Sequence, residues 1–158
     1  MHYLILPETS PPAGEALRTR PIDQVPAKHG SFAGAQRLLD LASVSCGLDV
    51  AEDLPDYPLD PKFRQELFLA FKEALTNVVR HAGATQVWLR MSVQDGELIV
   101  VVADNGRGFD AQQQRAGADG VANMKERLKS LQGGCEISGG TDKGTMVRFA
   151  APLPKRLL

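Results

Sequence analysis

The sequence predicts an α+β domain, a two-layer α/β sandwich in which helices pack on one face of a mixed, largely antiparallel sheet. Helical and extended segments follow the order helix–strand–helix–strand–strand–loop–helix–strand–strand, which favours a sheet covered by helices. The chain has 158 residues, of which 43% are hydrophobic and 23% charged, and these values fit a single globular domain.

The first third of the chain holds one predicted helix and one predicted strand. Eight of the ten prolines lie in the first 61 residues, and residues 1–30 are expected to be loosely structured or to belong to a neighbouring element. Ser31 can cap a helix that Gly47 should end. Residues 48–53 predict a short strand. The apolar positions of the helix are Phe32, Ala35, Leu38, Leu39, Leu41 and Ala42.

A second helix is predicted from its start and stop signals. Asp60 is a suitable N-cap, Pro61 suits the first helical position, and Gly83 should stop the helix after Ala82. Its apolar stripe, which we expect to be buried, consists of Phe63, Leu67, Phe71, Ala74, Leu75, Val78 and Val79.

The second half of the chain predicts most of the sheet. Alternating apolar residues from Val87 to Val93 indicate a half-buried strand, and Asp95-Gly96 is a strong hairpin turn. The remaining predicted elements are a central strand at 98–103, a helix at 120–131 stopped by Gly133-Gly134, and strands near 135–138 and 145–151.

The first candidate site lies on the second helix. Glu73, Asn77 and Arg80 are spaced at i, i+4 and i+7, so they share a face other than the apolar stripe. The amide oxygen of Asn77 suits Mg²⁺, and Glu73 could orient a metal-bound water. Arg80 and His81 could meet phosphate charge. The alternative is a solvated face in which Glu73 pairs with Lys72 or Arg80.

The second candidate site is a glycine loop opened by an acid. Asp104 follows the most apolar strand and should lie at the sheet edge of a pocket. Its carboxylate only accepts hydrogen bonds and therefore suits the exocyclic amino group of adenine. Gly106 and Gly108 permit backbone angles and close ligand approach that a Cβ would prevent. The alternative is a turn that merely needs glycine.

The third candidate site is Gly120 at the start of a predicted helix, where free backbone N–H groups attract phosphate. The polar residues 110–119 before it could form a short lid over a nucleotide, or an ordinary solvated loop. No single cluster is decisive. The prediction of a nucleotide-triphosphate site depends on their occurring together.

Composition bears on partners and location. A net charge of -1 gives no global reason to expect nucleic acid or an anionic membrane as partner. No apolar run approaches the ~20 residues needed to cross a bilayer. Cys46 and Cys135 form no Cys-x-x-Cys unit, which favours buried thiols over a disulfide or metal pair. We therefore expect a cytoplasmic domain that makes no contact with nucleic acid or membrane.

Four segments carry a family resemblance. Phe71–Ala82 resembles the N box of bacterial two-component sensor histidine kinases, Asp104–Phe109 their G1 box, Gly120–Met124 their G2 box, and Gly144-Thr145 their last glycine-threonine pair. The chain thus resembles the catalytic and ATP-binding domain of these kinases, in the superfamily that includes gyrase, Hsp90 and MutL. It looks closest to the branch whose response regulators carry helix-turn-helix domains. The match covers residues 31–152.

The resemblance implies a Bergerat-type ATP-binding fold and a role for each matching residue. Asn77 would ligate Mg²⁺, Glu73 would act catalytically on the metal-bound water, and Asp104 would read adenine with support from Thr145. The implied ATP-binding residues are Asn77, Arg80, His81, Asp104, Gly106, Gly108, Phe109, Gly120, Val121, Ala122 and Thr145.

The resemblance also implies an order of domains. Residues 1–30 could be the remnant of a linker to a dimerisation domain, residues 31–152 the ATP-binding catalytic domain and residues 153–158 a tail. None of His2, His29 and His81 precedes an acidic residue, as the family's phosphoacceptor usually does. The accepting histidine is thus expected on a separate dimerisation domain, with a response regulator downstream and a parent protein that could be membrane-anchored.

Two features leave other functions open. The family usually presents Gly-x-Gly before its G2 box, whereas Ala118-Asp119-Gly120 stands here. A non-catalytic nucleotide-binding module is therefore an alternative. A stand-alone anti-sigma-type serine kinase of the same superfamily would have about this size, and a truncated gyrase-like ATPase is a further alternative.

Overall fold

The computed structural model of the protein describes residues 20–21, 32–50, 59–108, 118–139 and 144–154. The elements of these residues are β1 (Arg20–Pro21), α1 (Phe32–Leu41), β2 (Ser45–Val50), α2 (Pro61–Asn77), the π-helical turn η3 (Val78–Ala82), β3 (Gln86–Gln94), β4 (Glu97–Asp104), α3 (Ala118–Ser130), β5 (Gly134–Gly139) and β6 (Thr145–Pro152).

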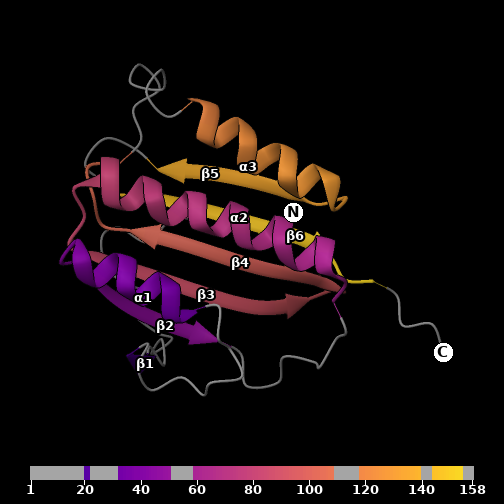
Figure 1. Cartoon of the computed structure of the whole chain (residues 1–158), viewed down its shortest axis with the longest axis horizontal. Coiled ribbons are helices and arrows are strands. Elements are labelled where there is room, and N and C mark those ends of the chain that lie inside the picture. Colours follow the sequence, from indigo (N-terminus) through magenta and orange to yellow (C-terminus); the bar gives the residue numbers. More distant parts are fainter. Residues whose placement is uncertain (1–19, 22–31, 51–58, 109–117, 140–143, 155–158) are drawn as a thin grey trace.

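These strands form one mixed sheet in the order β1-β2-β3-β4-β6-β5, with α1, α2 and α3 side by side on one face (Figure 1). Only β2 and β3 pair in parallel, and the other neighbouring strands are antiparallel. The predicted fold class, and the predicted order of helices and strands after residue 31, are confirmed. The short strand β1, which pairs with Leu48 and Gly47, lies in the segment expected to be irregular.

The core lies between the helices and the sheet. On β3 and β4 every second side chain faces the helices, as strand geometry requires, and the predicted stripe of α2 packs on them with Val79 only partly buried. The largest fully buried side chains are Phe149, Leu39, Leu48, Leu75, Leu89, Met124, Leu128, Val87 and Val102. This core holds α2 and α3 against β4 and β6, the strands that carry the candidate site.

The predicted start and end of the second helix are confirmed. The Phe63 N–H donates to Asp60 Oδ1 at 2.7 Å, and Pro61 occupies the first turn. Gly83 ends the helical segment with a φ of +60°, a conformation that favours glycine. The last five residues, Val78–Ala82, form a π-helical turn, which the sequence pattern did not predict.

The predicted end of the first helix was wrong. α1 ends at Leu41, the chain turns at Ser43 with a φ of +56°, and the Val44 N–H closes the helix on the Leu39 carbonyl. Gly47 lies inside β2, which begins at Ser45 because its parallel pairing with β3 begins there. Leu41, placed on the apolar face by the sequence, is 89% exposed. Ser31 and residues 51–53 lie outside the described residues.

Both ends of the third helix differ from the prediction. α3 begins at Ala118, two residues before Gly120. It ends through Gln132, which has a φ of +59°, and not through a left-handed glycine. Gly133 has a different reason to be glycine, since a Cβ there would collide with the carbonyl oxygen of Ala150 on β6. The glycine therefore permits a close approach of the chain to the sheet.

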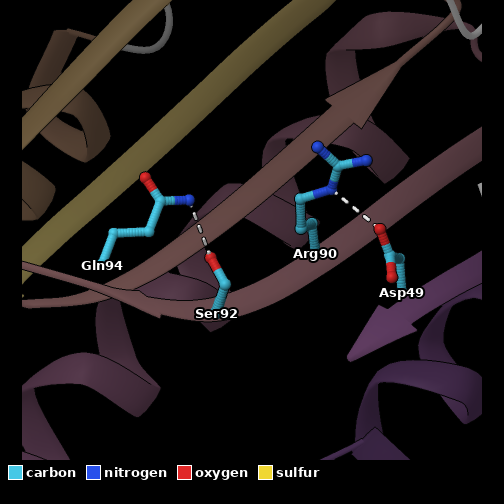
Figure 2. A network of polar contacts seen from close by, with 4 residues as sticks. All are labelled: Asp49, Arg90, Ser92 and Gln94. Atoms are coloured by element: carbon cyan, nitrogen blue, oxygen red, sulfur yellow. Dashed lines mark hydrogen bonds and ion pairs between the residues drawn. The ribbon is translucent and has the colours of Figure 1, made fainter. Parts of the chain in front are cut away.

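The face of the sheet opposite the helices carries polar pairs (Figure 2). Arg90 Nε donates to Asp49 Oδ2 at 2.9 Å across β3 and β2, and Gln94 Nε2 donates to Ser92 Oγ at 3.2 Å. The Arg90 and Asp49 side chains are 39% and 31% exposed, so this ion pair contributes about 0–1 kcal/mol. These residues are solvated and stand apart from the candidate site.

Two further features of the described residues are the state of the cysteines and the apolar character of the helices. Cys46 and Cys135, both within the described residues, are free thiols and are half-buried, less buried than the sequence predicted. Burial raises the pKa of each thiol to about 11, so both are protonated at neutral pH. Among the described helices, none has the length and apolar character needed to span a bilayer.

Candidate functional site

The site begins with Asp104, the last residue of β4. β4 lies between β3 and β6, so its carboxyl end is central in the sheet. Asp104 is 9% exposed, and its Oδ1 accepts a hydrogen bond from the Gly106 N–H at 2.8 Å. Burial raises the pKa of Asp104, while backbone hydrogen bonds from Gly106 and Thr145 oppose that shift. A desolvated acceptor held by its own loop suits recognition of a polar group.

The loop after Asp104 packs on the end of the second helix. A Cβ on Gly106 would collide with the carbonyl oxygen of Ala82 and lie 2.8 Å from its carbonyl carbon. The Arg107 N–H donates to the Ala82 carbonyl at 2.8 Å, and Arg107 Nε donates to the His81 carbonyl at 2.7 Å. Gly106 is therefore required by space, and Gly108, with a φ of +81°, by its backbone conformation.

Asn105 fastens the same loop to the start of β3. Its Oδ1 accepts from the N–H groups of Thr85 and Gln86 at 3.0 and 2.9 Å, and its Nδ2 donates to Thr85 Oγ1 at 2.9 Å. Sequence reasoning gave Asn105 and Arg107 no role. An asparagine inside a glycine loop is a signal for backbone hydrogen bonding, but partners about twenty residues earlier cannot be read from the pattern.

The glycine-threonine pair at the start of β6 closes the other side of Asp104. The Gly144 N–H donates to the Gly106 carbonyl at 3.1 Å. Gly144 has a φ of +72°, and a Cβ there would collide with the carbonyl oxygen of Asp104. Thr145, half-buried, follows as the first residue of β6. The Asp104 loop and the Gly144-Thr145 pair thus form one unit.

The first turn of α3 packs on the candidate metal-binding face of α2. A Cβ on Gly120 would collide with Oε1 of Glu73 and lie 3.2 Å from its Cδ. Asn77 lies one turn beyond Glu73, as the last residue of α2, and Arg80 and His81 are exposed in η3. Asn77 therefore lies, along the helical segment, between the Glu73–Gly120 contact and the Ala82–Gly106 contact.

The other predicted site residues divide into three cases. The Val121 side chain packs partly buried against the core, so only its backbone is available to a ligand, and Ala122 is exposed on α3. Phe109 and residues 110–117 of the expected lid lie outside the described residues. The described residues contain no group of three or more His, Cys, Asp or Glu side chains suited to a metal ion. A cation beside Asn77 would therefore take most of its ligands from phosphate and water.

An open groove of about 250 Å³ lies at the opposite end of α2 and is a separate feature. It is lined by Lys62, Glu66, Asn123, Glu126, Arg127 and Ser130. The groove is not lined by Asp104, nor by the residues that form the close contacts of Gly106, Gly120 and Gly144. We therefore define the candidate site by those contacts and not by the groove.

A buried acid at the end of a central strand, in a loop that packs on η3 beside the polar residues of α2, is an arrangement suited to an α+β domain of the nucleotide-binding class. Residues 64–155 match the family described as Histidine kinase-, DNA gyrase B-, and HSP90-like ATPase, and the chain belongs to this family. The family predicted from the sequence is thereby confirmed, and membership supports ATP binding by this domain.

Named relatives point to one part of that family. The chain is 32% identical over 124 residues to the sensor histidine kinase LiaS of Bacillus subtilis, covering 78% of this chain and 34% of LiaS. It is 29% identical over 108 residues to the sensor protein VraS of Staphylococcus aureus, covering 68% of this chain and 31% of VraS. The chain thus spans about a third of the length of these relatives.

A solved structure agrees with this grouping. The histidine kinase domain of the Erythrobacter litoralis EL346 blue-light activated histidine kinase has a TM-score of 0.67 and 25% sequence identity to this chain. The similarity covers 89% of this chain and 66% of that domain.

Proposed function

We propose that this chain is the catalytic domain of a two-component sensor histidine kinase, which binds Mg·ATP and donates the γ-phosphate to a histidine on a separate dimerisation and phosphoacceptor domain. One observation carries the proposal. Gly106, Gly120 and Gly144 each approach another cluster so closely that a Cβ would collide with it. These contacts link the four sequence clusters to one another through α2, η3 and the end of β4. The sensor kinases among its relatives favour this chemistry over other members of the ATPase family.

The adenine end of the proposed site is Asp104. Its carboxylate would accept a hydrogen bond from the exocyclic amino group, and Thr145, whose backbone already bonds the carboxylate, would support it. Gly106 and Gly108 would keep the loop flat against the base, since neither has a side chain. Phe109 belongs to this end through the family motif alone.

The phosphate end is the polar face of α2 and η3. Asn77 would ligate Mg²⁺, which when bound neutralises phosphate charge, and Arg80 and His81 would approach the phosphates from the exposed π turn. Glu73 would hold or orient a metal-bound water. The first backbone N–H groups of α3, near Gly120 to Ala122, would add donors to the phosphates. Catalysis would then depend on positioning and charge neutralisation.

The proposal needs a partner with the accepting histidine. His81 is assigned to the phosphates of the nucleotide in this proposal, and it is followed by Ala82 and not by an acidic residue. The partner is thus the dimerisation domain of the same kinase, with a response regulator downstream, of the helix-turn-helix kind if the resemblance to that branch holds. A cytoplasmic location belongs to the same proposal, for a parent protein with or without a membrane anchor.

The test is phosphate transfer to a supplied acceptor. The chain would be incubated with Mg·ATP labelled at the γ-phosphate and with the helical-hairpin domain of a sensor histidine kinase. We expect label on the hairpin that is lost in acid, as a phosphohistidine requires, and no label when the histidine is replaced by glutamine. Acid-stable label would favour the serine kinase. Tight Mg·ATP binding without transfer to any acceptor would favour the binding module.

A further inference from the structure

The backbone conformation of Gly120 does not explain why this position, which contacts Glu73, is glycine. Gly120 is not among the described glycines with positive φ, so its conformation is open to any residue. In a helix, alanine would be preferred to glycine by about 1 kcal/mol on intrinsic propensity alone. The structure gives one reason for glycine at this position in addition to the proposed phosphate contact, because an added Cβ would collide with Oε1 of the Glu73 carboxylate.

The two helices cannot easily move apart to make that space. α2 and α3 run antiparallel and side by side (Figure 1). Two turns along, Arg127 Nη1 donates to Glu66 Oε2 at 2.9 Å, and Met124 and Leu128 of α3 are fully buried in the core. Since α3 is held by its core residues, an added methyl group at position 120 would displace the more flexible Glu73 side chain.

We propose that Gly120 is a positioning residue for Glu73. Because glycine has no side chain, the Glu73 carboxylate can lie against the first turn of α3, one turn before Asn77 on α2. This inference rests on the proposed function, in which Glu73 acts beside the metal-bound phosphates. It assigns Gly120 a role beyond shaping the phosphate pocket, because the missing side chain leaves the space that the Glu73 carboxylate occupies. Displacing a reacting group by about 1 Å can lower a rate roughly 100-fold.

The first readout is stability, which does not depend on activity. G120A would be made in the wild type and in E73A, and the melting temperature measured for all four proteins. In the E73A background the carboxylate is gone, so G120A should raise the melting temperature as helix propensity predicts. In the wild type the same change should raise it less or lower it, because Glu73 must move. Equal increases in both backgrounds would overturn the proposal.

The second readout is phosphate transfer with the same four proteins. We expect G120A to lower kcat by about tenfold or more, since a group used in the transition state has moved, and to change kcat by a larger factor than KM for Mg·ATP. In E73A, G120A should cause no further loss. G134A is the matched control, because a Cβ there meets no atom within 4 Å. Unaltered kcat in G120A, or an additional loss in E73A, would contradict the proposal.

The two readouts separate the two ideas. If the wild type transfers no phosphate to any acceptor, the proposed function fails, while the melting temperatures still decide whether Gly120 makes room for Glu73. If transfer occurs but the melting temperatures show no coupling between the two residues, the proposed function stands and the positioning role falls.

Discussion

Replacing Asp104 by asparagine tests the adenine end of the site with the smallest change of shape, and its single amide oxygen must serve the backbone N–H groups of Gly106 and Thr145 that bond the carboxylate. The amide oxygen of asparagine can still accept the Gly106 N–H, which now bonds Asp104 Oδ1 at 2.8 Å. The amide NH₂ group, however, is a donor and cannot accept a hydrogen bond from the amino group of adenine. D104N should therefore keep the fold and lose the base contact.

The size of the loss follows from the strength of that contact. A hydrogen bond to a charged acceptor contributes about 1.5–3 kcal/mol, so D104N should weaken ATP binding by about 12- to 150-fold. The thermal stability of D104N, in contrast, should not decrease. Burial raises the pKa of Asp104, which means that the folded state holds this carboxylate ionised at a cost. The neutral asparagine avoids that cost, so D104N should unfold at the same or a higher temperature at neutral pH.

The assay compares ATP with inosine triphosphate, which has a carbonyl oxygen in place of the amino group. By calorimetric titration, the wild type should prefer ATP, and D104N should bind the two nucleotides with similar affinity. D95N, at the exposed hairpin turn, removes the same charge elsewhere and should change neither affinity. If D104N kept the wild-type preference for ATP, Asp104 would have no part in reading the base.

Three other predictions test the remaining parts of the site. N77A should weaken ATP binding only when Mg²⁺ is present, and an equal loss in EDTA would exclude the ligand role. G106A must shift the loop or η3 because of the Ala82 carbonyl, so unfolding should become easier by about 1–3 kcal/mol, with ATP binding lost and G134A unaffected. The pKa of Asp104 is raised above its ordinary value of 3.8. At pH values just above 3.8, the folded state therefore binds more protons than the unfolded state. Wild-type stability relative to D104N should therefore fall as the pH rises through this window, while ATP affinity should fall, in the wild type alone, as the pH drops through it.

Most of the fold could be predicted because local signals and tertiary packing agree. Asp60 and Pro61 start α2 as their chemistry requires, and Asp95-Gly96 forms the hairpin turn with positive φ at both residues. The errors lie where tertiary contacts decide. Gly47 reads as a helix stop by itself but lies in β2, because the pairing with β3 extends the strand to it.

The candidate site was only partly predictable for the same reason. Residue types made Asp104, Asn77 and the glycines candidates for the site, but the reason for each glycine differs and depends on distant atoms. Gly108 and Gly144 have positive φ, whereas Gly106 and Gly120 are required by neighbours about twenty and nearly fifty residues earlier. A pattern of glycines indicates a loop near a ligand. It does not say which approach each glycine permits.

Asn105 and Arg107 hold the loop after Asp104 in place by hydrogen bonds within the chain. Both side chains are on the exposed side of the loop, yet they bond the backbone from His81 to Gln86, the segment that joins η3 to β3. Because that segment follows directly on the helix face of Asn77 and Arg80, the loop that holds Asp104 is tied to the phosphate end by hydrogen bonds and a glycine contact. Both ends of a nucleotide would meet groups already fixed relative to each other, so less ordering would be required on binding.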